Sequence, residues 1–242
     1  MRRGWLIAIL GMFLVAAPST GAAAKTLVIG TEPNFPPLSY LEGSRIVGFE
    51  IDLIQELAKG MGDTVRLQNV SFGDQPKLLA SGKLDAAISS WTITPERAKT
   101  LAFSDPYFDA GQAIVVTQAS KLRTRHELKD LIVGVQQGTT GEASAKSQLK
   151  NQGVKPYADI AQAFEELDGG RIGAVVVDLP VALNEMKQRK GLKIIGGTLT
   201  AERYGIVSAP GQKALIQRLN AQLAKMKADG RYAKLYAKWF GQ

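Results

Sequence analysis

One arginine of the sequence lies at the predicted start of a helix. Thr94 and Pro95 supply a hydroxyl N-cap and a proline at the first helical position, which places Arg97 in the first turn. A cation is mildly unfavourable there because of the helix dipole. An anionic partner would account for Arg97, since a guanidinium binds a carboxylate through two parallel hydrogen bonds. A surface arginine or a salt bridge to a neighbouring glutamate is the alternative.

A segment with two threonines and two glycines follows a short apolar run. Residues 136–141 come after Ile132–Val135 and lead into a predicted helix. Free backbone N–H groups at a helix start bind anions, and glycine allows close approach. No G-K-[ST] ending is present, so a small carboxylate fits better than a nucleotide. The amides of Thr139 and Thr140 are therefore candidates for binding a carboxylate, with an ordinary capped loop as the alternative.

An aspartate ends a third apolar run. Asp178 follows Ala174–Val177 and can either bind an ammonium group or cap the helix that begins near Leu179. With Arg97 and the two threonine amides on the carboxylate and Asp178 on the ammonium, these three segments would hold the common end of an α-amino acid.

The composition excludes several kinds of catalysis. The 242 residues include no cysteine and one histidine, His126. Thiol nucleophiles and disulfides are therefore impossible, zinc sites built from several Cys and His ligands cannot be assembled, and a Ser-His-Asp mechanism would have to use His126. That histidine lies in a polar stretch, and we expect it on the surface. We expect no metal and no cofactor.

Short apolar runs alternate with helical patterns along the chain, which is typical of βαβ units and a largely parallel sheet. The alternation begins at residue 26 and starts again at residue 113, which suggests two α/β lobes with a ligand in the cleft between them. Strands are predicted at 26–30, 65–70, 85–88, 113–117, 132–135, 174–177 and 204–208. Helices are predicted at 51–61, 76–80, 141–150, 161–167, 179–190, 215–226 and 232–239.

Residues 1–24 have the three-part layout of a secretory signal peptide. Arg2 and Arg3 precede the apolar run Trp5–Ala17, and small residues in an A-x-A pattern precede Lys25. The run is shorter than the ~20 residues that a spanning helix needs, so we expect cleavage after Ala24 rather than retention as an anchor. The mature chain would then be exported, with no stable insertion in the membrane.

The positive charge does not indicate nucleic-acid binding. The formal charge of +8 comes from lysines and arginines that are spread over predicted helices and loops. A nucleic-acid-binding protein needs a basic stripe or interleaved aromatic side chains, and neither is present. We therefore expect no nucleic acid as a partner and interpret the charge mostly as a contribution to solubility.

Several motifs, in order along the chain, resemble those of the periplasmic solute-binding proteins of bacterial ABC transporters, in the polar amino-acid-binding group (family 3). The resemblance covers essentially all of the chain after residue 24. It implies a type II periplasmic-binding-protein fold: two hinged α/β lobes, joined by two strands, that close on a central cleft. Lobe 1 would comprise residues 25–107 and 205–242, and lobe 2 residues 108–204. The motifs are GFEIDL at 48–53, ISSWTITPER at 88–97, FSDPY at 103–107 and KWFG at 238–241.

The resemblance also implies which side chains bind the common end of the ligand. Arg97 would bind the carboxylate, and Thr92 and Thr140 would add hydrogen bonds to it. Ser90 and Asp178 would receive the ammonium group.

The remaining implied ligand contacts concern the ligand side chain. The rings of Phe35 and Phe72 would sandwich it, and Glu32 would contact its far end. A glutamate beneath two rings suits a cation, through charge pairing and cation–π contact. Glu32 is one methylene longer than the family's usual aspartate, and Gln136 and Gly141 also depart from several relatives. The resemblance therefore indicates a basic or polar L-amino acid, with lysine, arginine, ornithine and histidine as the leading candidates.

Three other residues of the motifs are expected to be structural. In an extended segment, Ser90 and Thr92 point one way and Trp91 the other, so Trp91 would pack into lobe 1 if its neighbours face the cleft. Glu50 and Asp52 lie near a helix start, where the dipole favours anions.

The function expected from these observations is binding without catalysis. The chain would be a monomeric periplasmic component that captures an amino acid and delivers it to a permease in the inner membrane. One alternative is a cleft enzyme of the cyclohexadienyl dehydratase type, which would need a positioned general acid. The other is a sensor. A receptor of that kind requires a spanning helix, which we do not expect here, whereas reporting the ligand to a separate receptor stays open.

Overall fold

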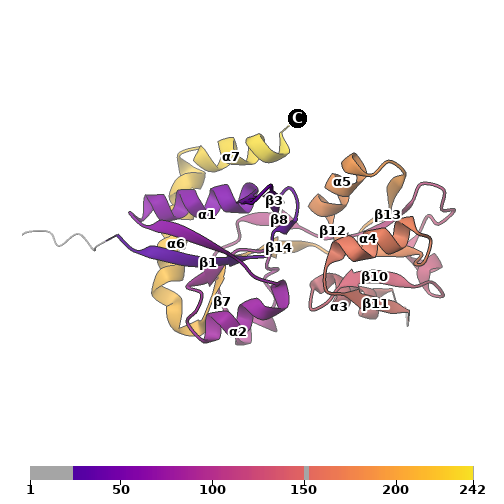
Figure 1. Ribbon diagram of the computed structural model, residues 1–242, viewed down its shortest axis with the longest axis horizontal. Coiled ribbons are helices and arrows are strands. Elements are labelled where there is room, and N and C mark those ends of the chain that lie inside the picture. The colour runs from indigo at the N-terminus through magenta and orange to yellow at the C-terminus, as the bar shows by residue number, and fades with distance from the viewer. Residues whose placement is uncertain (1–23, 150–152, 242) are drawn as a thin grey trace, which may run out of the picture.

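The computed structural model describes residues 24–149 and 153–241, and two five-stranded sheets form the centres of its two lobes (Figure 1). The two-lobed α/β fold expected from the sequence is thereby confirmed. The predicted signal peptide at 1–24 lies outside the described residues, apart from Ala24. Within the described ranges, no helix is long and apolar enough to cross a membrane, and no group of three or more metal-ligating side chains occurs.

The sheet of the first lobe has the strand order β5-β1-β6-β15-β7, in which β1 is parallel to β5 and β6, and β15 is antiparallel to its neighbours. Successive side chains of a strand point to opposite faces, so Leu27 and Ile29 pack beneath α1 and α6, whereas Val28 faces the α2 side. The strands are β1 (Thr26–Thr31), β5 (Thr64–Asn69), β6 (Ala86–Ala87), β7 (Ala102–Phe103) and β15 (Val207–Ser208), and the helices are α1 (Phe49–Gly60), α2 (Gln75–Ala80), α6 (Lys213–Ala228) and α7 (Arg231–Phe240).

The sheet of the second lobe has the strand order β11-β10-β12-β9-β13, in which β10, β11 and β12 are parallel and β9 is antiparallel to both neighbours. Val175 and Val177 of β12 face the cluster beneath α4 and α5, and Val176 faces the cluster beneath α3. The strands are β9 (Gln112–Thr117), β10 (Val133–Gln136), β11 (Val154–Tyr157), β12 (Ala174–Asp178) and β13 (Leu192–Thr198), and the helices are α3 (Thr140–Gln148), α4 (Ile160–Asp168) and α5 (Leu179–Gln188).

An antiparallel ribbon of two strands lies between the lobes (Figure 1). It pairs β8 (Phe108–Ala110) with β14 (Glu202–Tyr204). The chain enters the second lobe after β8 and returns to the first through β14. The division of the chain after residues 107 and 204 stays a prediction.

Two sequence-based predictions about local structure are wrong. The helix expected to begin at Thr94 is a 3₁₀ turn of three residues, Arg97–Lys99, because the chain turns back at once into β7. The strand expected at 204–208 is divided between β14 and β15, since Gly205 and Ile206 connect the ribbon to the first sheet. A small sheet beside α1 was not predicted; it consists of β2 (Asn34–Phe35), β3 (Ser39–Glu42) and β4 (Arg45–Val47).

Trp91 and Asp52, expected to be structural, and His126, expected on the surface, are placed accordingly. Trp91 is 4% exposed, stacks on Phe72 with ring centroids 4.1 Å apart and donates its indole N–H to Gln75 Oε1 at 2.7 Å. Asp52 accepts hydrogen bonds from Lys238 and from the Trp239 indole, and so ties α7 to α1. His126 is exposed.

Candidate ligand-binding site

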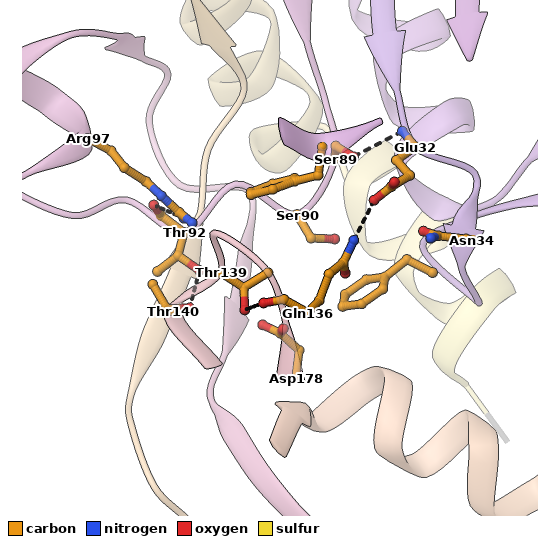
Figure 2. A pocket seen from close by; sticks show the side chains of 12 residues that line it. Glu32, Asn34, Ser89, Ser90, Thr92, Arg97, Gln136, Thr139, Thr140 and Asp178 are labelled. Atoms are coloured by element: carbon orange, nitrogen blue, oxygen red, sulfur yellow. Dashed lines mark hydrogen bonds between the residues drawn. The ribbon is translucent and has the colours of Figure 1, made fainter. Parts of the chain in front are cut away.

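A cavity between the lobes brings all nine candidate site residues together (Figure 2). Its lining atoms leave about 350 Å³ of space, part of which is continuous with solvent. The loops after β1 and β6 provide most of one wall, and the starts of α3 and α5 provide the other. That these side chains contact a ligand stays a prediction. The lining residues are Glu32, Asn34, Phe35, Phe72, Ser89, Ser90, Thr92, Arg97, Gln136, Thr139, Thr140 and Asp178.

Arg97 spans the two walls with its guanidinium group. Nη1 donates to the Thr92 carbonyl oxygen at 3.1 Å, within the first lobe, and Nη2 donates to the Gly138 carbonyl oxygen at 3.1 Å, in the second. The guanidinium carbon lies 4.9 Å from the centroid of the Trp91 ring. Burial lowers the pKa of Arg97, and the nearby carboxylates oppose that effect. A guanidinium has five donors, so the group can also hold an anion in the cavity.

The turn expected to bind a carboxylate forms the N-terminus of α3. Thr139 is the N-cap residue, and its hydroxyl accepts a hydrogen bond from the Glu142 amide at 3.3 Å. The capping role weighed in the sequence analysis is therefore real. With Thr139 as the N-cap, the first backbone amides of α3, including that of Thr140, lie near the cavity, where the helix dipole favours an anion.

Asp178 ends β12 and occupies the N-cap position of α5, but its side chain does not cap that helix. Instead it is 7% exposed and accepts a hydrogen bond from the Tyr204 hydroxyl. Burial raises the pKa of Asp178 to about 6, and the charge of Glu202 contributes in the same direction. A buried carboxylate of this kind gains from a cationic partner, such as an ammonium group in the cavity.

Glu32 and Gln136 make a hydrogen bond across the cleft. The Gln136 side-chain amide donates to Glu32 Oε2 at 2.7 Å (Figure 2). Burial raises the pKa of Glu32, and this hydrogen bond opposes the increase. Gln136 comes from β10 in the second lobe, so this end of the cavity presents a carboxylate and an amide together. Such a pair can accept from and donate to a polar side chain of a ligand.

The two phenylalanines expected to sandwich a ligand side chain have different surroundings. Phe72 stacks on Trp91, which leaves its other face toward the cavity. Phe35 is partly buried and packs against the core clusters of both lobes.

Glu50 accepts two hydrogen bonds from Ser90, a connection that the sequence did not predict. Ser90 has a left-handed backbone with φ of 52°, which is uncommon for a residue with a side chain. Glu50 Oε1 accepts from the Ser90 amide at 2.8 Å, from the Ser90 hydroxyl at 2.9 Å and from the Tyr107 hydroxyl. Burial raises the pKa of Glu50 to about 7. The only sequence signal was its place in the GFEIDL motif.

Three more lining residues were absent from the predicted site: Asn34, Ser89 and Gln136. Gln136 lies in the segment 136–141 that was considered for anion binding from the sequence, but its side chain had no predicted role. Ser89 lies in the quoted motif beside Ser90, and its hydroxyl accepts from the Glu32 amide at 3.1 Å. Asn34 is the first residue of β2, two positions after Glu32, and it belongs to none of the motifs found in the sequence.

Comparison with known proteins identifies a family and several relatives. The bacterial extracellular solute-binding proteins, family 3, match residues 27–242. The putative ABC transporter arginine-binding protein 2 of Escherichia coli (strain K12) is 34% identical over 94% of this chain and 96% of its own length. A solved structure of an ancestral arginine-binding protein bound to glutamine is 43% identical, with a TM-score of 0.85 over 90% of this chain and 98% of that chain. The ancestral amino-acid-binding protein AncCDT-1, a precursor of cyclohexadienyl dehydratase, is 37% identical, with a TM-score of 0.83 over 89% and 95% of the two chains.

Proposed function

The chain belongs to the bacterial extracellular solute-binding proteins of family 3, and we propose that it is the amino-acid-binding component of an ABC importer. The resemblance seen in the sequence motifs is confirmed by the family match. One observation carries the proposal: a cation of the first lobe, Arg97, and an acid of the second, Asp178, line the same cavity. The two groups suit the carboxylate and the ammonium of one α-amino acid.

Binding would require contacts with both lobes at once. Arg97 and the first amides of α3 hold the carboxylate, while Asp178 and Ser90 receive the ammonium. Because these groups come from different lobes, a ligand stabilises the closed arrangement over the open one by its differential contacts. The closed protein then delivers the amino acid to a membrane permease, acting as a periplasmic monomer after removal of residues 1–24. No catalytic step is part of this function.

The side-chain end of the cavity favours a basic or polar amino acid. Glu32 supplies a carboxylate and Gln136 an amide at this end, and Phe72 supplies a ring. Arginine fits these groups because its guanidinium can donate to Glu32 and stack on a ring. The relatives named for arginine support the same choice, and lysine, ornithine, histidine and glutamine are the next candidates.

Isothermal titration with the twenty common L-amino acids and ornithine tests the proposal. We expect binding of arginine or another of these candidates, one molecule per chain, with mass spectrometry of the purified protein naming any ligand that it already carries. Failure of every amino acid to bind would refute the proposal.

The similarity to AncCDT-1 gives one specific reason to test a second function. A dehydratase needs a general acid that faces the substrate, and Asp178, with a pKa raised to about 6, is the cavity carboxyl best suited to that role. Incubation with prephenate and with arogenate would detect turnover. We expect none, because Arg97 and Asp178 form a complete pair for an amino acid's two charges.

A further inference from the structure

A carboxylate of the hinge ribbon joins the two walls of the cleft outside the ligand cavity. Glu202 lies on β14, and its Oε2 accepts from the Thr92 hydroxyl at 2.7 Å and from the Thr140 hydroxyl at 2.8 Å. Thr92 belongs to the first lobe and Thr140 begins α3 of the second. We call Glu202, Thr92 and Thr140 the hydroxyl–carboxylate clamp. Its Thr92 segment is already joined to β14 by backbone pairing, as in the bridge between Thr92 and Tyr204, so the contact with Thr140 is the one that crosses between the lobes.

The clamp is supported by buried neighbours. Gln112, fully buried, donates its side-chain amide to Thr140 Oγ1 at 3.2 Å and to Glu202 Oε2 at 3.3 Å. The Thr200 hydroxyl donates to Glu202 Oε1 at 2.8 Å. A methyl group at Gly141 would come within 2.8 Å of Gln112 Oε1, so glycine there permits this position of Gln112. Both carboxylate oxygens of Glu202 are therefore held.

The clamp limits what its two hydroxyl groups can offer to a ligand in the cavity. A threonine hydroxyl has one hydrogen, and in this arrangement Thr92 and Thr140 each donate theirs to Glu202. Toward the cavity these hydroxyls then present only lone pairs. A ligand carboxylate must therefore rely on Arg97 and on backbone amides, whereas an ammonium group can donate to the hydroxyls.

Opening the cleft would break the clamp. Separating the lobes moves Thr92 away from Thr140, whose hydroxyl oxygens lie 3.3 Å apart, so Glu202 can keep at most one of its two partners. Charge-assisted hydrogen bonds are stronger than neutral ones, so their loss disfavours the open arrangement. Every atom of the clamp belongs to the chain itself, so its contribution does not depend on a ligand.

We propose that Glu202 is a positioning residue of the binding site, which holds the hydroxyls of Thr92 and Thr140 together and biases the lobes toward closure before a ligand binds. A second consequence rests on the proposed amino-acid binding: the clamp slows release of the bound ligand, because release requires opening.

Distance measurements on the ligand-free protein test the bias directly. The chain has no cysteine, so Ser81→Cys and Gln148→Cys place unique spin labels on exposed positions at the ends of α2 and α3. Double electron–electron resonance then reports closed and open populations after any carried ligand has been removed by unfolding and refolding. We expect a closed population that falls about tenfold relative to the open one in Glu202→Ala, equivalent to about 1.4 kcal/mol.

Further variants separate the clamp from a general loss of stability. Glu202→Gln keeps an oxygen that can accept from a hydroxyl and should restore part of the closed population. Thr140→Val has nearly the same shape without the hydroxyl and should shift the populations in the same direction as Glu202→Ala. If Glu202→Ala does not fold, Thr140→Val alone tests the clamp. Glu165→Gln removes an exposed carboxylate of α4 and should change nothing. An entirely open ligand-free protein, or unchanged populations in Glu202→Ala and Thr140→Val, would overturn the proposal.

Stopped-flow dissociation of bound arginine completes the test. We expect the dissociation rate to rise about tenfold in Glu202→Ala, with a smaller change in the association rate. If the populations shift but no amino acid binds, the clamp stands and the proposed function fails. If amino acids bind and neither populations nor dissociation rates change, the clamp fails and the proposed function stands.

Discussion

The wall of the cleft that belongs to the first lobe is built from side chains, whereas the wall of the second lobe is built mainly from helix starts. Glu32, Phe72 and Arg97 come from loops or short turns of the first lobe, and their long side chains project into the cavity. In the second lobe, Thr140 begins α3 and Asp178 directly precedes α5, so short side chains and the first backbone amides of these helices lie at the cavity. Both walls can therefore hold the charges that all α-amino acids share, through Arg97 in the first and Asp178 in the second. The groups suited to a particular side chain, Glu32 and Phe72, belong to the first wall, and Gln136 joins them from the second.

The largest effect should come from the cation of the first wall. Arg97→Ala removes the donors for the ligand carboxylate and also the hydrogen bond to Gly138 across the cleft. Truncating one partner of a buried, hydrogen-bonded charge pair costs roughly 2–5 kcal/mol, so Kd should rise about 100-fold or more for every amino acid that binds. Titration calorimetry measures this, with Arg45→Ala, an exposed arginine of β4, as the matched control. Wild-type affinity in Arg97→Ala would remove the assignment of the carboxylate site.

The acid of the second wall should affect all ligands almost as strongly and should add a dependence on pH. Asp178→Asn removes the charge that pairs with the ammonium, and Kd should rise about 30-fold.

Because the pKa of Asp178 is raised to about 6, the ligand-free protein carries a proton there at lower pH, and binding must displace it. Affinity of the wild type should therefore weaken about tenfold for each pH unit below 6 and be constant above about 7. Titrations at several pH values in the wild type and in Asp178→Asn check this. Equal pH profiles in the two proteins would show that Asp178 does not receive the ammonium.

A substitution at the far end of the first wall should discriminate between ligands. Glu32→Gln removes the negative charge but keeps the length and a hydrogen-bonding oxygen. Kd for arginine or lysine should rise about tenfold, and Kd for glutamine about twofold or less, because only the cations lose an ion pair. Competition titrations measure the ratio. Equal effects on arginine and glutamine would contradict the view that the first wall selects a basic side chain.

The smallest effect on binding should come from a substitution of Glu50, the buried residue that accepts hydrogen bonds from Ser90 of the first wall. The contribution of Glu50 to the stability of the fold should depend on pH. The pKa of Glu50 is raised from 4.5 to about 7 in the folded protein, so the folded state holds this proton more tightly than the unfolded state. The corresponding stability is fully present below about pH 4.5 and is lost as pH rises to about 7, a change on the order of 3 kcal/mol.

In Glu50→Gln this part of the pH dependence should disappear, and Kd should change only a few-fold, since the amide oxygen can still accept from Ser90. Thermal unfolding from pH 5 to pH 8 measures it, with Glu42→Gln, an exposed carboxylate, as the control. The same pH dependence in Glu50→Gln and in the wild type would show that another group is responsible.

Local patterns predicted the elements that carry both walls, though not always their form. The apolar runs predicted β10 and β12 because buried strands of a parallel sheet are continuously apolar. Trp91 packs inward, as predicted from alternation along an extended segment, although the left-handed backbone of Ser90 interrupts that segment. The helix predicted at Thr94 failed, since a capping signal indicates where a helix can begin but not whether the chain has room to continue it.

The sequence by itself determined the kind of chemistry that is possible: no thiol, almost no histidine, and a cation, two helix starts and an acid at the ends of apolar runs. These features depend on residue type and short spacing, which a sequence states directly. Only the tertiary structure decided which groups share hydrogen bonds. Glu202 lies 110 residues from Thr92 and 62 from Thr140, and Gln136 lies 104 residues from Glu32. Contacts over such separations leave no periodic pattern, because they arise when the two lobes meet.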